Sequence, residues 1–231
     1  MKKVESRVDW IYAKVATMVA NFEFKPDERI NEGTLAKKLG SSRTPLREAL
    51  NRLVAEEFLT FHAHQGFFCR TLDPKTVFDL YNARLAIETE SIRLAIHKAT
   101  DAEILKIESF LDDTQSSYSK TSSFETLVEL DEEFHMQLLR LSDNDELERI
   151  LGNLNAKIRY VRRIEIGDQP TITEAAHRRI LAAIKIRDET KAVFELRGHI
   201  SRRREDANSA VQRAFSKLYV PSSSSFMERS E

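Results

Sequence analysis

Hydrophobic side chains recur at steps of three and four residues through most of this chain, which is the spacing of one face of an α-helix. Beyond residue 73 the pattern predicts about six helices, over residues 74–98, 101–119, 123–142, 144–165, 171–187 and 189–216. Only 6 glycines and 5 prolines interrupt the 231 residues, so the predicted fold class is mainly α.

A different pattern occupies the beginning of the chain. Residues 31–53 hold two short helical repeats, and Gly40 between them can adopt the left-handed conformation that ends a helix. Ser42 can cap the second of these helices, and Leu46, Leu50 and Leu53 lie at the spacing of its buried face. Residues 57–71 contain two aromatic and β-branched runs around Gly66, which predicts a β-hairpin. A helix-turn-helix followed by a hairpin is the winged helix-turn-helix arrangement.

These patterns together predict two domains. An N-terminal winged helix-turn-helix domain covers residues 1–72, a linker covers 73–77, and an all-α six-helix bundle covers 78–217. The serine-rich end, residues 218–231, has the composition of a disordered tail.

The charge balance adds a small asymmetry between the two domains. The whole chain carries 36 Lys and Arg against 37 Asp and Glu, so no strong overall field points to nucleic acid or membrane. Residues 1–72 carry a net charge of +3, from 12 basic and 9 acidic residues, and the remainder carries −4, from 24 and 28. A mildly basic first domain is compatible with DNA binding.

Cysteine usage and the N-terminal sequence bear on location. The single cysteine, Cys69, excludes a disulfide or a thiolate metal cluster within one chain, which fits a reducing compartment. The start, MKKVESRVDWIYAK, lacks the apolar block of a secretion signal, and no uncharged run approaches about 18 residues. We therefore expect a soluble, cytoplasmic protein with no membrane partner.

The second short helix presents polar and basic groups at its N-terminal end. Arg43, Thr44 and Arg47 lie there, away from the apolar face of the helix. An arginine in the major groove can bind O6 and N7 of guanine, and a helix N-terminus favours a phosphate. The alternative is a solvated face with ordinary surface ion pairs, but the turn, the cap and the hairpin together favour recognition of double-stranded DNA.

Four residues that are costly to bury without partners lie on apolar stripes of the second domain. Asp131 and His135 are four residues apart on the stripe of residues 124–139, so their side chains point the same way. His177 and His199 lie on the stripes of the fifth and sixth predicted helices. Three imidazoles and one carboxylate suit Zn²⁺, or equally Ni²⁺, Mn²⁺ or Fe²⁺. The alternative is three separate core histidines bonded to carbonyl groups and an aspartate paired with an arginine.

Arginines on these helices could attract an anionic ligand. Arg84 has helical spacing with apolar neighbours and could direct its guanidinium into the same interior to bind a carboxylate. Its alternative role is an ion pair on the surface with Glu88, four residues further on. Arg159, Arg162 and Arg163, in the sequence KIRYVRR, could add anion attraction, although such close neighbours cannot all face inward, and Arg159 and Arg163 are the two taken as effector contacts.

The residues of the first domain resemble those of a known family. SSRTPLREAL followed by RLVAEEFLTFHAHQGFF is similar to the DNA-binding half of the GntR family of bacterial transcription regulators. The positions that this resemblance places in contact with DNA are Ser42, Arg43, Thr44, Arg47 and the wing-tip Gly66. The sequence departs from the family pattern in three ways. Glu57 replaces the glycine common before the wing, the proline often seen in the hairpin is absent, and Gly33 stands where relatives often carry a basic residue.

The second domain resembles the ligand-binding half of the FadR branch of the same family. D-x-x-x-H, then EAAHRRILAAIKIRD, then RGHI are similar to the FCD domain, and the two resemblances cover about residues 8–216. The metal ligands of the metal-binding members match Asp131, His135, His177 and His199. The resemblance also implies a small organic acid as effector, bound beside or on the metal.

The sequence thus predicts a homodimeric, ligand-responsive transcription regulator and not an enzyme. A dimer follows from two recognition helices that read half-sites roughly 34 Å apart. Repression of a catabolic operon is the expected activity. Two alternatives stay open, which are a metalloenzyme with Glu132 or Glu133 as its base, and a regulator with a purely structural metal.

Overall fold

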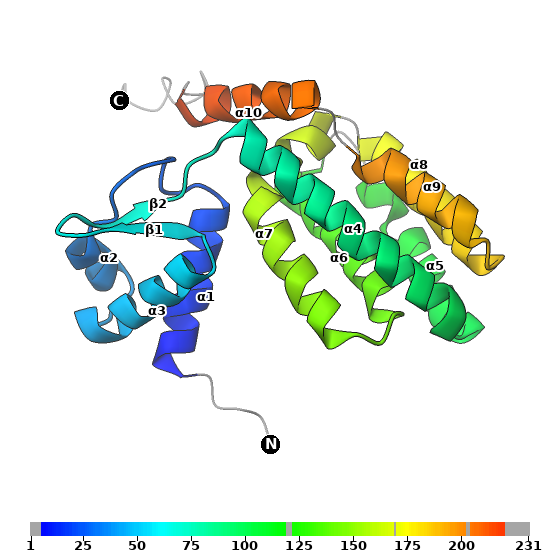
Figure 1. Ribbon diagram of the computed structural model, residues 1–231, viewed down its shortest axis with the longest axis horizontal. Helices are drawn as coiled ribbons and strands as arrows, with labels where there is room; N and C mark the ends of the chain where they lie inside the picture. Colours follow the sequence, from blue (N-terminus) through cyan, green and yellow to red (C-terminus); the bar gives the residue numbers. More distant parts are fainter. Residues whose placement is uncertain (1–5, 119–121, 169, 202–203, 220–231) are drawn as a thin grey trace, which may run out of the picture. The chain divides into compact units, whose positions relative to one another are not determined.

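The computed structural model describes residues 6–118, 122–168, 170–201 and 204–219. The chain divides into two compact units, one of Met1–Asp73 with Ser216–Glu231 and one of Pro74–Phe215. Most of the tail predicted over residues 218–231 lies outside the described residues. The mainly α fold class is confirmed, because helices dominate both units apart from one small sheet (Figure 1).

The first unit is a winged helix-turn-helix. Its elements are α1 (Arg7–Ala20), α2 (Glu32–Lys38), α3 (Arg43–Ala55), β1 (Leu59–His62) and β2 (Gly66–Cys69). The two strands pair antiparallel, with Leu59 opposite Cys69 and His62 opposite Gly66. An isolated bridge joins Arg29 to Phe68, so a third segment lies along the free edge of β2.

The apolar residues predicted for the helix-turn-helix form its core. Leu46, Leu50 and Leu53 of α3 are fully buried, and α3 packs on α1 through the buried Ile11 and Val15. At about 25 cal/mol per Å² of apolar surface, each such side chain contributes roughly 1.5–3 kcal/mol on burial. This packing holds the solvent-facing side of α3 in a fixed position on the unit.

A residue in the left-handed backbone conformation follows the end of α2, before the turn, and another follows the end of α3, before the wing. Gly40 has φ +56°, and its N–H and that of Ser41 donate back to Lys37 and Ala36, so the predicted helix stop is confirmed. Glu57 has φ +62° and closes α3 in the same way. Ser42 occupies the N-cap position of α3, but its side chain makes no capping hydrogen bond, contrary to expectation.

The described part of the second unit is built from helices alone. Their bounds are α4 (Pro74–Lys98), α5 (Asp101–Thr114), the 3₁₀ turn η1 (Gln115–Ser117), α6 (Phe124–Arg140), α7 (Asp145–Asp168), α8 (Pro170–Lys185), α9 (Glu189–Ile200) and α10 (Arg204–Tyr219), of which the residues up to Phe215 belong to this unit. Figure 1 shows the long α4 running beside α7 and α9, and α6 pairs with α7 as α8 pairs with α9. None of the helices in the described ranges is long and apolar enough to cross a membrane.

The last predicted helix, residues 189–216, is two helices in the structure. α9 ends at Ile200 because Ser201 adopts extended backbone, with φ −57° and ψ 137°, and α10 begins at Arg204. Gly198 lies within α9, and no proline or glycine stands at residues 199–204, so the continuous polar and apolar pattern gives no sign of the break. The break leaves His199 in the last turn of α9, where it faces the interior of the unit.

Candidate metal and effector site, and the candidate DNA-recognition face

The four predicted metal ligands come together inside the second unit. Asp131 and His135 lie one turn apart on α6, His177 lies on α8 and His199 lies near the end of α9. The first three are buried to 1% exposure or less, and the side chain of His199 is 13% exposed. Helices distant in sequence therefore supply one cluster, as the apolar stripes predicted.

The donor atoms of this cluster lie at distances suited to one ion. Nε2 of His135 is 3.0 Å from Nε2 of His199, and Nε2 of His177 is 3.1 Å from Oδ1 of Asp131. The same oxygen is 3.6 Å from His199 and 3.8 Å from His135, and all four donor atoms lie within 4.8 Å of one another. Donors bound to one cation at roughly 2.0–2.2 Å stand about 3–3.5 Å apart in tetrahedral geometry. The donor set and its spacing therefore fit a divalent transition metal.

The protonation state of the imidazoles favours ligation. Burial lowers the pKa of His135 to about 4, and burial also lowers the pKa values of His177 and His199 well below the ordinary value. Phe134 adds to this apolar surrounding, because its ring stacks on that of His177 with centroids 4.0 Å apart. Neutral imidazoles with free Nε2 lone pairs are the form that binds a metal.

Each buried ligand has an outer partner that fixes its orientation. Nδ1 of His135 lies 2.5 Å from Oε2 of Glu88, which leaves Nε2 turned towards the cluster. Nδ1 of His177 lies 3.5 Å from the hydroxyl of Tyr118. Carboxylate and hydroxyl partners of this kind set the tautomer of a metal-binding histidine.

Asp131 divides its two oxygens between the cluster and α7. Oδ1 faces the imidazoles, and Oδ2 forms an ion pair with the guanidinium of Arg162, which is 3% exposed. Burial lowers the pKa of Arg162 to about 9, so this arginine still carries its charge at pH 7. Because the guanidinium engages only one oxygen of this carboxylate, the other oxygen is available to a cation.

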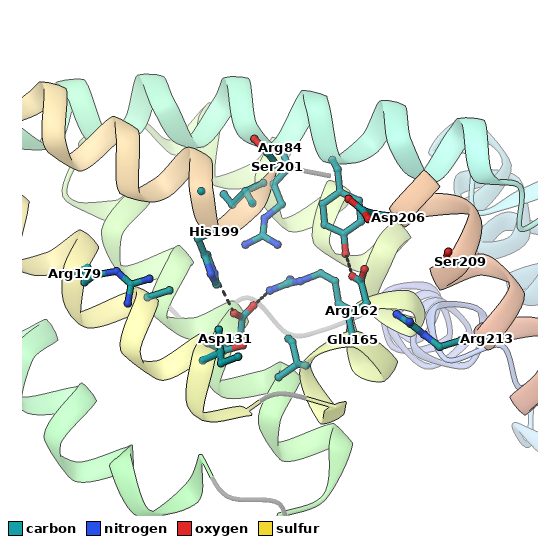
Figure 2. A pocket seen from close by; sticks show the side chains of 17 residues that line it. Arg84, Asp131, Arg162, Glu165, Arg179, His199, Ser201, Asp206, Ser209 and Arg213 are labelled. Carbon is teal, nitrogen blue, oxygen red and sulfur yellow. Dashed lines mark hydrogen bonds and ion pairs between the residues drawn. The ribbon is translucent and has the colours of Figure 1, made fainter. Parts of the chain in front are cut away.

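A cavity of about 580 Å³ opens beside the cluster (Figure 2). Its polar lining includes Tyr81, Arg84, Asp131, Arg162, Glu165, Thr173, Arg179, His199, Ser201, Asp206, Ser209 and Arg213. Figure 2 shows Arg162 and His199 pointing towards Asp131, with Arg84 reaching down from α4 to the same region. This volume falls within the range of about 300–1,000 Å³ found for small-molecule sites.

Arg84 combines the two roles that the sequence left open. Its Nε lies 2.5 Å from Oε1 of Glu88, so the pair exists, but both side chains are buried and not on the surface. The Nη2 atom of Arg84 is buried without a hydrogen-bond partner among the described residues, and the side chain lines the cavity. Although burial alone would raise it, the charge of Arg84 and the hydrogen bonds from Arg84 and His135 lower the pKa of Glu88 below its ordinary value. Arg84 therefore lies between the cavity and Glu88, the residue that contacts the metal-ligand candidate His135.

The structure brings Arg162 to the cavity, and not Arg159 or Arg163. Arg159 pairs with Glu125, Glu129 and Glu132, and Arg163 also pairs with Glu125. Both arginines thus face the acidic side of α6, and neither lines the cavity. Their positions do not support the effector contacts predicted for them, because carboxylates of α6 engage both guanidinium groups away from the cavity.

The two residues named as possible bases are engaged elsewhere. Glu132 is paired with Arg159, and burial raises its pKa to about 7. Glu133 pairs with Arg140 on an exposed side of α6. Neither residue lines the cavity, so neither is placed to act as a base on a molecule bound there.

The predicted DNA-contacting residues share one face of the first unit. Ser42, Arg43, Thr44 and Arg47 are exposed on the first turns of α3, and Gly66 begins β2 at the wing tip with φ +94°. A recess of about 410 Å³ lies among them, lined by Arg29, Ile30, Asn31, Glu32, Gly33, Arg43, Arg47 and Gln65. Arg43 fills the space above Gly33, since its Nη2 lies 3.6 Å from where a Cβ would stand on that glycine.

Three residues of these sites are not predicted from the sequence. The sequence indicates Glu88 only as a surface partner of Arg84, and it does not single out Arg162 from its neighbours. Nothing in the sequence marks the acidic Glu32, which lies among the basic residues of the recognition face. Glu88 had one usable signal, because it lies on the same side of its helix as Arg84 and Ser91, and all three are buried.

Two family models match this chain. The model described as bacterial regulatory proteins, gntR family, matches residues 8–69, and the model described as FCD domain matches residues 79–202. The Nta operon transcriptional regulator of Aminobacter aminovorans is 38% identical over 208 residues, which cover 90% of this chain and 98% of that protein. The uncharacterized HTH-type transcriptional regulator YdhC of Bacillus subtilis is 31% identical, over 82% of this chain and 86% of its own.

A solved structure supports the same architecture. The E. coli McbR/YncC structure aligns with a TM-score of 0.69 and 19% identity, over 92% of this chain and 99% of that one. At this identity the likeness shows the fold alone. The two named relatives are transcriptional regulators and not enzymes, so the metalloenzyme alternative loses its support.

Proposed function

Because the chain belongs to the GntR family of bacterial transcription regulators and carries an FCD domain, we propose that it regulates transcription in response to a metal-dependent effector. In this proposal a homodimer binds operator DNA through its winged helices. Its FCD domain holds a divalent metal and a small organic acid. The acid alters the affinity of the dimer for its operator.

The DNA-binding part of the proposal rests on the exposed face of α3. Ser42, Arg43, Thr44 and Arg47 are solvent-exposed there, while the opposite face of the same helix is fully buried. A helix held rigidly by its apolar face can enter the major groove, and its arginines can then reach guanine or phosphate. A backbone-only approach to the duplex suits Gly66 at the wing tip, because no side chain intervenes.

The metal part rests on the chemistry of the donor set. Asp131, His135, His177 and His199 offer one carboxylate oxygen and three neutral imidazole nitrogens within 4.8 Å. Such a set suits Zn²⁺ first, and also Ni²⁺, Mn²⁺ or Fe²⁺. A bound metal with fewer protein ligands than its preferred coordination number would supply an open position to a carboxylate oxygen.

One observation carries the effector part, which is that Nη2 of Arg84 has no hydrogen-bond partner among the described residues. A buried guanidinium nitrogen without a hydrogen bond is costly, so a ligand that accepts a hydrogen bond from it would be stabilised there. The group lines the cavity that also exposes His199 and Asp131. A carboxylate placed there would meet both the guanidinium and the metal position, which supports an organic acid as the ligand.

Of repression and activation, repression requires fewer contacts with other proteins. A dimer seated on an operator excludes other proteins from that duplex by occupancy alone. An acid that binds better to the DNA-incompetent arrangement would then release the operator, by the difference in its affinity for the two arrangements.

The DNA part is tested by selection from a random duplex library, followed by gel shifts at two salt concentrations. We expect enrichment of a two-fold related sequence whose half-sites are about one duplex turn apart. Binding should weaken as salt rises, because phosphate contacts release counterions. Failure to enrich any duplex would overturn the proposal.

The metal and effector parts are separated by two measurements on tag-free protein. Elemental analysis should find about one equivalent of metal in the wild type and only traces in His177→Ala. Thermal shifts with a panel of hydroxy acids, sugar acids and dicarboxylates should then identify a stabilising acid. Arg84→Lys keeps the charge beside Glu88 but loses the planar fork, so it should retain metal and lose the acid response. A protein that responds to chelator and to no acid would have a purely structural metal.

A further inference from the structure

One acidic residue lies within the recognition face of the first unit. Glu32, the first residue of α2, lines the recess that Arg43 and Arg47 also line. Its side chain is only 21% exposed, whereas that of Arg47 is 52% exposed. A carboxylate in this place repels the phosphates of a bound duplex, so its presence calls for a compensating role.

The contacts of Glu32 point to Arg47 and to the wing. Its Oε2 atom lies 3.6 Å from Nε of Arg47, so the pair joins α2 to the exposed side of α3. Its Oε1 atom lies 3.7 Å from the position of a Cβ on Gly66, which places the carboxylate against the wing-tip backbone. Glu32 thus fills the space between the recognition helix and the wing.

Arg47 is held from a second direction as well. Its guanidinium lies 5.7 Å from the ring centroid of Phe67, a fully buried residue of β2. The ring and the carboxylate come from different elements, and together they restrict a side chain that has several rotatable bonds. An arginine whose orientation is fixed beforehand loses less conformational entropy when it forms two hydrogen bonds to a guanine edge.

We propose that Glu32 is a positioning residue that orients Arg47 for base recognition, and that it raises sequence discrimination while it lowers affinity for DNA in general. The proposal rests on the proposed role of α3 as the recognition helix. Under this proposal the carboxylate of Glu32 increases sequence discrimination and decreases the affinity for DNA of any sequence. If Glu32 only stabilised α2, its replacement would not lower sequence discrimination and raise general DNA affinity at the same time.

The test compares wild type with Glu32→Gln on three duplexes at fixed salt. These are the sequence that wild type enriches from a random library, variants of it with single guanine substitutions, and a scrambled sequence. For Glu32→Gln we expect discrimination against one guanine substitution per half-site to fall by about 5- to 30-fold, a share of what a bidentate contact contributes. Affinity for the scrambled duplex should rise by about 2- to 5-fold, because one negative charge is removed.

Two further variants separate positioning from charge and folding. Glu32→Asp keeps the charge but shortens the reach to Arg47, so discrimination should fall without a gain on the scrambled duplex. Glu23→Gln removes a charge of the same unit at a position outside the recess, where Glu23 pairs with Lys38, and should preserve discrimination. Thermal melting of each variant in the absence of DNA reports its folding.

The outcomes distinguish this inference from the function on which it rests. If wild type itself does not discriminate among the duplexes, the recognition role of α3 fails, and the inference fails with it. If wild type discriminates and Glu32→Gln discriminates equally well, only the inference is overturned. Tighter and more selective operator binding by Glu32→Gln would also overturn it, because Glu32 would then restrain Arg47 from DNA.

Discussion

Oε2 of Glu88, on α4, lies 2.5 Å from Nδ1 of His135, on α6, with both side chains buried. Because Nδ1 is engaged in this contact, the opposite nitrogen of the ring is directed towards His177 and His199. The other oxygen of Glu88 binds Arg84. A residue that would not touch the metal thus connects one of its ligands to the cavity.

Glu88→Gln should lower metal affinity by about 10- to 100-fold, the range for loss of an outer partner of a metal-binding histidine. The amide keeps the shape of the side chain but loses the charge that supports the imidazole and balances Arg84. Competition with a chromogenic chelator measures the affinity. Glu133→Gln, an exposed change on α6, is the matched control and should bind metal like wild type. Equal affinities for all three proteins would contradict the role of Glu88.

Metal-free protein should lose stability as the pH falls from 7 to 4. The pKa of His135 is lowered to about 4 by burial, so the unfolded chain takes up protons below about pH 6.5 that the folded chain does not. For His135 alone this amounts to about 3 kcal/mol near pH 4. Stability is therefore greatest above pH 6.5 and decreases on acidification.

Thermal melting between pH 7.5 and pH 4.5, with and without added Zn²⁺, measures this effect. Metal should displace the loss towards lower pH, because a bound imidazole resists protonation. His177→Gln should flatten the profile of the metal-free protein, since burial also lowers the pKa of His177. His97→Gln, at an exposed position, should not. A profile that is identical with and without Zn²⁺ would argue against the site.

Replacing Glu57 with glycine should stabilise the first unit by about 0.5–1 kcal/mol. The residue has φ +62°, a left-handed conformation in which a Cβ is strained, and the gain is reduced by the greater freedom of glycine in the unfolded chain. Glu57→Ala is the matched control and should show no gain, because alanine keeps the Cβ. Chemical denaturation of both variants measures the difference, and a stabilised alanine variant would show that backbone strain is not the cause.

Arg43→Ala and Arg47→Ala should each weaken binding to the selected operator by about 5- to 100-fold. Both side chains are exposed on α3 and are therefore accessible to a duplex. Loss of a phosphate contact should also reduce the salt dependence by about one unit of slope, whereas loss of a base contact should chiefly relax specificity. Arg93→Ala, on α4 of the other unit, should bind like wild type. Wild-type binding by both α3 variants would remove that helix from the interface.

Much of the fold could be predicted from the sequence, because its local signals agree with its tertiary structure. Gly40 marked the end of α2, and helical spacing placed Leu46, Leu50 and Leu53 in the core. The break at Ser201 could not be predicted, because no proline or glycine stands at the break itself and the nearby Gly198 lies within the helix.

The candidate site was predictable where burial of polar residues was visible along one helix. Asp131 and His135 lie on an apolar stripe, so periodicity alone indicated that they needed partners. Glu88 and Arg162 were not identified as those partners, since periodicity does not reveal which helices lie beside α6 or how they are rotated. The choice of Arg162 over Arg159 and Arg163 depends on that rotation.

The divided carboxylate of Asp131 has a consequence for helices that supply no ligand. Oδ2 reaches α7 through Arg162, while His135 reaches α4 through Glu88. An ion held at the cluster would therefore restrain the fluctuations of both helices as well as of those that coordinate it. Amide hydrogen exchange should slow around residues 84–92 of α4 and 158–164 of α7 when the metal is bound. Binding of one ion would then reduce the mobility of most helices of the bundle.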